Sequence, residues 1–325
     1  MRKEFEETIL KVTAAKGIIN SDPIQSLWSG YGEITRVNLL KVQVSSVIVK
    51  NIQLPKQSNH LRGWNTTISH QRKIKSYEVE MSFYKQWSEL CKDNCRVPKC
   101  YAVSTIGEES LIVLEDLDAS GYPIKKSSLT KEETKTCLKW LANFHAAFMN
   151  IVPEGLWEKG TYWHLSTRSE EFEVMKNGEL KESAKQIDQI LNNCKHQTFV
   201  HGDAKVANFC FSTDGTEVAA VDFQYVGGGC GIKDVAYLMG SCLTESECEK
   251  LEKELLNYYF KELESTLGKI HKKLKFKELE KEWRYLYSFA WADFTRFLLG
   301  WMPTHQKLNN YSQQQVSKTL LLLNK

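Results

Sequence analysis

Two stretches decide how this chain is interpreted: Phe199-Val200-His201-Gly202-Asp203-Ala204-Lys205-Val206-Ala207-Asn208-Phe209, and after it Val218-Ala219-Ala220-Val221-Asp222-Phe223-Gln224. In each stretch an apolar run typical of a β-strand leads into acidic or amide side chains. Such oxygen-bearing side chains bind the magnesium of a nucleotide and position an acceptor hydroxyl during phosphoryl transfer. We therefore expect Asp203 to orient and deprotonate a hydroxyl, and Asn208 and Asp222 to bind magnesium.

The order of these residues can be compared with that of protein kinases, in which a catalytic Asp precedes a metal-binding Asn and an Asp-Phe-Gly segment. Here His201-Gly202-Asp203 stands for His-Arg-Asp, and Asp222-Phe223-Gln224 stands for Asp-Phe-Gly. Gly, Asp and Asn are common turn residues, so each of them alone has an ordinary structural explanation. Their order, with one strand-like run between them, favours a phosphotransferase.

The pattern resembles the kinase-like small-molecule phosphotransferases of the aminoglycoside phosphotransferase and choline kinase superfamily. It is most similar to the ecdysteroid-kinase-like (CHK-kinase-like) branch, where His-Gly-Asp and Asp-Phe-Gln occur together. Leu141-Ala142-Asn143-Phe144-His145-Ala146 and Asp234-Val235-Ala236-Tyr237 match two further motifs of that family. The resemblance implies an α+β, two-lobed protein-kinase-like fold. Residues 1–116 would form a nucleotide-binding lobe with an antiparallel sheet, and residues 117–325 a mainly helical lobe for catalysis and acceptor binding.

Composition is compatible with this architecture. The 325 residues, of which 42% are hydrophobic and 26% charged, are enough for two sizeable lobes. Lysine and arginine exceed aspartate and glutamate by only 43 to 40, so no strong field attracts nucleic acid or an anionic membrane. We therefore expect a small-molecule partner. No apolar run suits a signal peptide or a membrane span, which favours the cytosol, and the scattered cysteines are expected to be free thiols.

Two glycines, Gly30 and Gly32, lie between β-prone runs, as in a hairpin that places backbone amides over nucleotide phosphates. We take both as candidates for nucleotide binding. Thr35 occupies the third glycine position of the kinase pattern, so an ordinary hairpin turn is an equal alternative.

The run Val44 to Lys50 predicts a strand with Ile48 and Lys50 on one face. A kinase strand of this kind places an aliphatic residue at adenine and a lysine at the phosphates, and we expect Ile48 and Lys50 to do the same. The alternative is a lysine in solvent at the end of a strand.

A helix is predicted from Ser69 to Leu90, and in kinases a glutamate on this helix pairs with the strand lysine. At about 100° per residue, Glu80 shares a stripe with Tyr84, whereas Glu78 points to nearly the opposite side. We therefore expect Glu80 to pair with Lys50.

The lobes are expected to join after a buried strand that ends at Glu115-Asp116-Leu117. In the family that the chain resembles, this segment offers main-chain groups to adenine, so Glu115 and Leu117 are implied as nucleotide-binding residues. An ordinary strand end is the alternative, because backbone contacts leave little trace in a sequence.

The C-terminal half offers further candidates. An aromatic-rich helix over 285–301 should lie mostly in the core, with some residues at an acceptor pocket, and we single out Trp291 and Asp293 for substrate contact. Lys205 follows Asp203 by two residues and is a catalytic candidate for contact with the transferring phosphate. A surface lysine at the cleft edge is the alternative. His145 is expected to be a satisfied core histidine.

Together these residues predict an ATP- and magnesium-dependent phosphotransferase that acts on a hydroxyl of a small molecule. A protein kinase is less compatible, because no Ala-Pro-Glu segment lies between Asp222 and Asp234. A catalytically silent nucleotide-binding scaffold is the other alternative, and the retention of Lys50, Asp203 and Asn208 argues against it. The aromatic residues suit a steroid, a quaternary ammonium or an aromatic alcohol alike.

Overall fold

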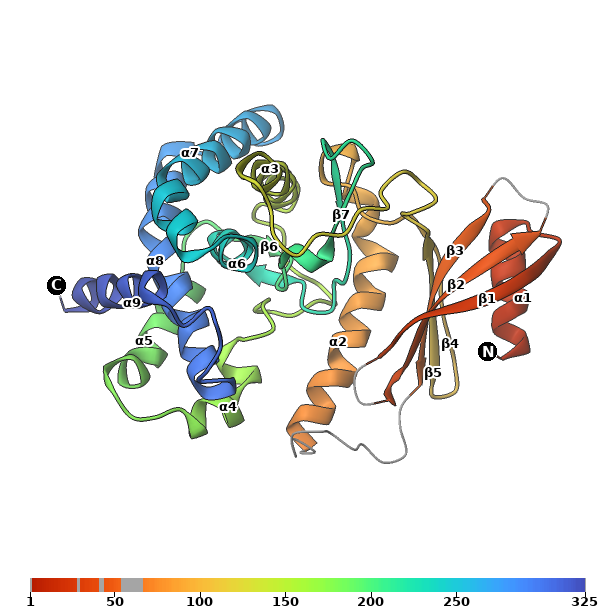
Figure 1. The fold of residues 1–325 in the computed structure, drawn as a ribbon, viewed down its shortest axis with the longest axis horizontal. Coiled ribbons are helices and arrows are strands. Elements are labelled where there is room, and N and C mark those ends of the chain that lie inside the picture. Colours follow the sequence, from red (N-terminus) through yellow and green to blue (C-terminus); the bar gives the residue numbers. More distant parts are fainter. Residues whose placement is uncertain (1, 28–29, 41–43, 54–66, 325) are drawn as a thin grey trace.

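The computed structural model describes residues 2–27, 30–40, 44–53 and 67–324. The chain forms two lobes: a sheet with its helices carries the N-terminus, and a larger, mainly helical part carries the C-terminus (Figure 1). The predicted α+β, two-lobed fold is confirmed. The sequence Gly63-Trp64-Asn65-Thr66 predicts a loop, and these residues lie outside the described ones.

An antiparallel sheet with the strand order β1-β2-β3-β5-β4 forms the N-terminal lobe in the described part of the chain. On one face, Val47 and Val49 pack against Phe5 of the first helix, which the sequence predicted as amphipathic. Since side chains alternate along a strand, Ile48 and Lys50 point to the other face, toward the long helix α2 (Figure 1). These elements are α1 (Lys3–Thr13), β1 (Gly17–Ser26), β2 (Gly32–Leu40), β3 (Ser46–Gln53), α2 (Thr67–Gln86), β4 (Cys100–Ile106) and β5 (Glu109–Glu115).

Helices dominate the C-terminal lobe. They are α3 (Lys131–Ala147), α4 (Ser169–Val174), α5 (Glu179–Asn192), α6 (Ile232–Cys242), α7 (Glu245–Ile270), α8 (Phe276–Trp301) and α9 (Asn310–Leu323). Capping boxes at Thr130 and Thr244 explain where α3 and α7 begin, because each threonine and the glutamate three residues later satisfy two free backbone N–H groups.

The boundary between the two long helices of the charged C-terminal region differs from our expectation. The sequence predicts that residues 244–284 are charged and helical and that an aromatic-rich helix follows them, whereas α7 ends at Ile270 and α8 runs from Phe276 through the aromatic residues. The first half of α8 has one buried face, with Leu279 and Trp283, and exposed residues such as Lys277 and Glu278, whereas its second half is buried on nearly all sides, so one helix changes its composition as it enters the core.

Two short antiparallel strand pairs place the decisive stretches side by side. Strand β6 (Thr198–Val200) pairs with β9 (Gly227–Gly229), and β7 (Phe209–Phe211) pairs with β8 (Val218–Ala220). The segment 201–208, called the HGD loop below, therefore lies beside Asp222, and the N–H of Val221 donates to the Asn208 carbonyl over 3.0 Å.

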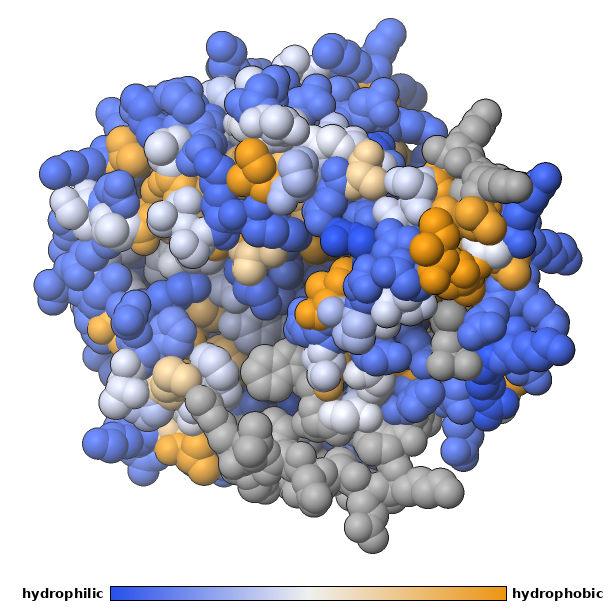
Figure 2. Space-filling model, turned by 45° about the vertical axis from the view of Figure 1, so that its right-hand side comes forward, coloured by the Kyte–Doolittle hydropathy of each residue, from blue (hydrophilic) through white to orange (hydrophobic). Residues whose placement is uncertain are grey.

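The surface is mostly hydrophilic on the face drawn in Figure 2, with hydrophobic residues in separate groups. In the part of the chain that the structure describes, we find no helix with both the length and the apolar character needed to cross a bilayer.

Candidate active site

A cavity of 980 Å³ is lined by residues of both lobes. It brings together most of the site residues predicted from the sequence. Those among its lining residues are Ile48, Lys50, Glu80, Glu115, Leu117, Asp203, Lys205, Asn208 and Asp222.

The HGD loop is anchored by Asp234, in the first turn of α6. The Asp234 carboxylate accepts hydrogen bonds from the backbone N–H groups of His201 (2.6 Å) and Gly202 (3.0 Å). His145 Nε2 lies 3.1 Å from the same carboxylate, and its Nδ1 lies 2.7 Å from the Tyr259 hydroxyl. These buried polar groups satisfy one another. His145 is thus a satisfied core histidine as predicted. The sequence places Asp234 in the first turn of a helix, where a negative charge suits the helix dipole, and this structural interpretation missed its role as anchor of the HGD loop.

The two carboxylate oxygens of Asp203 have different surroundings. Oδ2 lies 2.8 Å from Lys205 Nζ and 3.1 Å from Asn208 Nδ2, whereas Oδ1 is buried and has no partner among the described residues. Burial raises the pKa of the Asp203 carboxyl, and the Lys205 ammonium opposes that shift. Oδ1 is therefore the carboxylate oxygen that neither Lys205 nor Asn208 binds.

Oxygen donors that fit a magnesium ion lie next to Asp203. Asp222 Oδ1 is also buried without a partner among the described residues, and Asn208 uses only its amide nitrogen in its bonds to Asp203. Within the described ranges, no group of three or more His, Cys, Asp or Glu residues forms a candidate metal site. The donors here are thus carboxylate and amide oxygens, the hard ligands that magnesium prefers.

The backbone around these donors adopts positive φ angles. Asp222 has a φ of 70°, which is uncommon for a residue with a side chain and costs about 1–3 kcal/mol. Gly202 has a φ of 79°, and a Cβ there would lie 2.1 Å from the Tyr225 carbonyl oxygen. The HGD loop therefore requires glycine at position 202.

Phe223 connects the metal-ligand region to α2. Its ring stacks on that of Phe83, with centroids 4.0 Å apart, and lies 4.7 Å from the His201 ring. The next residue, Gln224, places its Oε1 3.4 Å from Ser76 Oγ and 3.5 Å from Lys73 Nζ. The Asp-Phe-Gln segment thus fixes α2 against the HGD loop.

The predicted ion pair between Lys50 and Glu80 is present. Lys50 Nζ lies 2.5 Å from Glu80 Oε2, and the two side chains are only 6% and 3% exposed. Glu78 is 55% exposed and lies 3.7 Å from Lys75, so the helical phase predicted from the sequence is confirmed. Burial raises the pKa of the Glu80 carboxyl, and the Lys50 charge opposes that shift.

A further lysine, Lys73 on α2, lines the cavity, and the sequence analysis missed it. Its Nζ lies 5.0 Å from the Tyr77 ring centroid, and burial lowers its pKa to about 8. Lys73 precedes Glu80 by seven residues, or two helical turns, and this spacing could have placed both on one face.

The segment that joins the lobes also borders the cavity. The Glu115 carboxylate pairs with Arg96 at 2.6 Å, and the backbone N–H of Glu115 donates to the Lys99 carbonyl. The Leu117 carbonyl accepts from the Tyr122 N–H over 2.8 Å, while no described residue accepts from the Leu117 N–H. That N–H is therefore a main-chain donor at the cavity without a described acceptor, and nucleotide contact by Glu115 and Leu117 stays a prediction.

Gly30 and Gly32 are not among the residues that line the cavity, although Leu27 and Tyr31 are. Gly32 has a φ of 124°, and a Cβ there would lie 1.9 Å from the Asn51 carbonyl oxygen. The close approach of β2 to β3 thus accounts for this glycine, and phosphate contact at either position remains a prediction.

Aromatic rings line the part of the cavity beyond Asp203. Tyr162 and Phe297 lie 5.4 Å apart, and Tyr237 and Phe294 lie 4.9 Å apart, measured between ring centroids. The Arg168 guanidinium lies over the Tyr162 and Phe297 rings. We call the following set the aromatic wall: Tyr162, Tyr225, Tyr237, Phe294, Phe297 and Trp301.

Comparison with protein families identifies the chain. A model of the ecdysteroid kinase-like family matches residues 36–162 and 157–272. The chain belongs to the ecdysteroid kinase-like family. This is a kinase-like phosphotransferase family, as the sequence motifs predicted, and no curated protein matches the sequence.

The chain is similar to solved structures of three small-molecule kinases. An amicoumacin kinase in complex with AMP-PNP, Ca2+ and Ami is 16% identical, with a TM-score of 0.55 over 98% of this chain and 97% of that chain. An aminopropanol kinase associated with a microcompartment is 13% identical, with a TM-score of 0.49 over 97% and 94% of the two chains. An ethanolamine kinase of Plasmodium vivax is 12% identical, with a TM-score of 0.48 over 92% and 82%.

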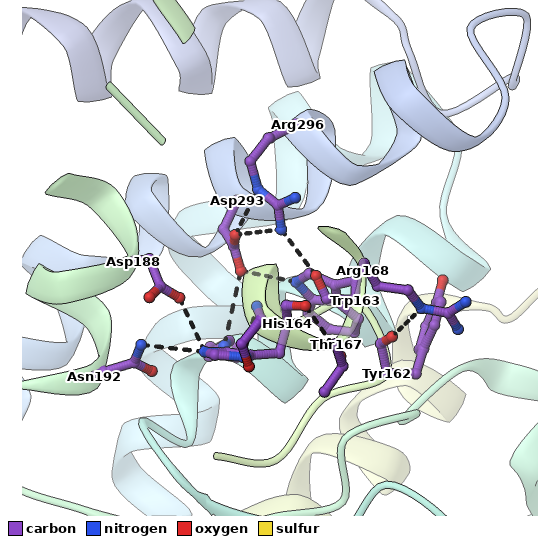
Figure 3. A network of polar contacts seen from close by, with 11 residues as sticks. Tyr162, Trp163, His164, Thr167, Arg168, Asp188, Asn192, Asp293 and Arg296 are labelled. Carbon is purple, nitrogen blue, oxygen red and sulfur yellow. Dashed lines mark hydrogen bonds and ion pairs between the residues drawn. The ribbon is translucent and has the colours of Figure 1, made fainter. Parts of the chain in front are cut away.

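One pair of residues in this ecdysteroid kinase-like chain does not lie where we expected it. Neither Asp293 nor Trp291 is among the residues that line the cavity. Asp293 is buried, accepts from Trp163 Nε1 over 3.0 Å and pairs with Arg296 at 2.9 Å (Figure 3). Trp291 is also buried, and its ring packs on that of Tyr311.

Helical geometry explains this difference. The residues of α8 that reach the cavity, Phe294, Phe297 and Trp301, are spaced by three and four and therefore share one stripe. Asp293 and Trp291 lie on either side of that stripe. Asp293 supports the aromatic wall from behind through Trp163, and a substrate contact by either residue has no support in the structure.

Proposed function

We propose that the chain transfers the terminal phosphate of ATP, with magnesium, to a hydroxyl group of a small molecule. The observation that carries this proposal is the convergence of Lys50, Asp203, Asn208 and Asp222 on one cavity. Membership of a kinase-like phosphotransferase family supports it, as do the nucleotide analogue and divalent ion in the amicoumacin kinase complex.

Each residue has a task that follows from its surroundings. When bound, magnesium and ATP supply the phosphoryl group and the positive charge that neutralises its oxygens. Asn208 and Asp222 would hold the ion through their free oxygens, and Lys50, kept in place by Glu80, would hold the nucleotide phosphates. Asp203 would orient the acceptor hydroxyl and take its proton at Oδ1, because Oδ2 is already bound by Lys205 and Asn208.

The division of labour between the lobes is part of the same proposal. Residues 1–116 would bind the nucleotide, with Ile48 at adenine, and the Leu117 N–H would contact adenine from the junction of the lobes. Residues 117–325 would carry the catalytic groups and the acceptor site, which we place at the aromatic wall beyond Asp203. Lys205 would contact the transferring phosphate, for which it must leave its present partner, Asp203 Oδ2.

A screen of hydroxyl compounds for ATP consumption by the purified chain tests the proposal. Consumption that depends on both the acceptor and magnesium, and that is lost in Asp203→Asn, would support it. A chain that binds ATP tightly but transfers phosphate to no acceptor in a broad library would instead be a nucleotide-binding scaffold. Direct binding of ATP, measured by calorimetry, separates these two results.

A further inference from the structure

Lys307 is a cation of the cavity without an anionic partner. It belongs to the connection between α8 and α9 and lines the cavity. Its ammonium group lies 5.0 Å from the Tyr237 ring centroid and 5.6 Å from that of Phe294. Lys50 and Lys205 each pair with a carboxylate, and Lys73 and Lys125 contact the polar side chains of Gln224 and Cys210. The Lys307 ammonium has neither kind of partner among the described residues.

The connection that carries Lys307 is held in place. The Lys307 N–H donates to His305 Nδ1 over 3.1 Å, and the His305 ring lies 6.0 Å from the Trp301 ring. The Leu308 N–H donates to the His305 carbonyl over 2.9 Å. Burial lowers the pKa of Lys307 to about 8, and the Asp203 charge opposes that shift. The group is thus a positioned ammonium that is still mostly protonated at neutral pH.

The described carboxylates that line the cavity already have a partner or a proposed role. Each either pairs with a cation of the protein or belongs to the proposed magnesium site. They are Glu80 with Lys50, Glu115 with Arg96, Asp116 and Asp118 with Arg36, Asp203 with Lys205, and Asp222 at the proposed magnesium site. Apart from Asp203, which would face the acceptor hydroxyl, no described lining carboxylate therefore remains to pair with a cationic acceptor.

A second cation, Arg168, lies beside the aromatic wall. Arg168 lies over the Tyr162 and Phe297 rings, donates to the Tyr162 carbonyl and pairs with Glu171 at 3.0 Å. The Arg168 guanidinium thus already has a carbonyl and a carboxylate partner, whereas the Lys307 ammonium has neither among the described residues. A bound anion would give Lys307 the charged hydrogen-bond partner that it lacks, and a bound ammonium would meet uncompensated repulsion.

We propose that the acceptor is an alcohol with an apolar, ring-containing body and an anionic oxygen group such as a carboxylate, and that Lys307 binds this group. The aromatic wall would hold the body, and Asp203 would face the hydroxyl. This inference rests on the proposed function, because it takes the aromatic wall as the acceptor side of a phosphotransferase site. It adds to that function a selection for negative charge.

Three compounds with one body test the charge preference: a hydroxymethyl-naphthalene carboxylate, its carboxamide, and its aminomethyl counterpart as the ammonium ion. Affinity is measured by calorimetry on the full chain with ADP and magnesium present, so that the phosphate-facing cations are occupied. We expect the carboxylate to bind about tenfold tighter than the carboxamide, and the ammonium compound to bind most weakly. This comparison needs no variant.

Variants then test whether the Lys307 charge causes the preference for the carboxylate compound. In Lys307→Met the carboxylate should bind within about twofold of the carboxamide, while carboxamide affinity itself stays within about threefold of wild type. Lys307→Arg should keep the preference. Lys126→Met is the matched control, because Lys126 also lines the cavity but pairs with Glu133, and it should keep the preference as well.

Equal binding of carboxylate and carboxamide by the wild-type chain would overturn the inference. A preference that survives Lys307→Met, or failure of all three compounds to bind at millimolar concentration, would overturn it too. Phosphate transfer is read separately. Transfer to neutral alcohols with no effect of Lys307 would keep the proposed function and remove this inference, whereas charge-selective binding without transfer to any alcohol would remove the function and keep the anion site.

Discussion

Replacing Glu80 by glutamine tests the ion pair at the centre of the N-terminal lobe. The substitution keeps the size of the side chain and removes its charge, so Lys50 is left buried without its carboxylate. Breaking a buried pair from one side costs about 3–5 kcal/mol, because the remaining charge is uncompensated. We expect the lower end of that range, since the Asp222 carboxylate interacts electrostatically with this region.

Glu78→Gln is the matched control. It makes the same chemical change on the same helix, at a side chain that is 55% exposed and 3.7 Å from Lys75. Exposed pairs of this kind contribute about 0–1 kcal/mol, so the free energy of unfolding should change by less than about 1 kcal/mol. Urea denaturation followed by tryptophan fluorescence measures both variants under the same conditions.

A double variant separates loss of charge from loss of packing. In Lys50→Met/Glu80→Leu both charges are replaced by apolar groups, a change that is often neutral or stabilising, so it should be more stable than Glu80→Gln alone. Equal denaturation midpoints for Glu80→Gln and Glu78→Gln would refute this reasoning. Reduced ATP affinity in Glu80→Gln, but not in Glu78→Gln, would in addition support the nucleotide role of Lys50.

Further predictions concern the HGD loop and its metal ligands. Asp203→Asn should lower turnover by at least about a thousandfold and leave ATP affinity nearly unchanged, because Asp203 acts on the acceptor; turnover near wild type would remove it from catalysis. Asn208→Ala and Asp222→Ala should each shift magnesium titrations of ATP binding to higher concentration, and superimposable curves would contradict the ligand assignment. Lys205→Met should lower turnover by about tenfold to a thousandfold with little change in ATP affinity, and a loss below about twofold would leave only its bond to Asp203.

Local periodicity was enough to predict the parts of the site that depend on one element or one pair of elements. Strand alternation placed Lys50 toward the cavity, and helical phase chose Glu80 over Glu78. The order of strand-like runs predicted that Asp203 and Asp222 lie close together, because each follows a short strand, β6 or β8. These features depend on spacing along the chain and are visible before any packing is known.

Features that depend on packing between distant elements were not predictable in this way. Asp234 anchors backbone groups of the HGD loop from a separate helix. Asp293 turned toward Trp163 instead of the cavity, since helical phase alone does not say which neighbour covers a face. Lys307 reaches the cavity from a connection more than ninety residues beyond the HGD loop, and no pattern in the sequence marks it.

The Asp-Phe-Gln segment shows why three consecutive residues must be considered together. Asp222 aims an unpartnered oxygen at the cavity only because its backbone adopts a left-handed conformation, which is strained for a residue with a side chain. Phe223 is fully buried among rings of α2 and the C-terminal lobe, and burying such a side chain contributes about 1.5–3 kcal/mol. That contribution is of the same size as the strain at Asp222. Packing of Phe223 therefore both joins the lobes and offsets the strain that sets the orientation of Asp222.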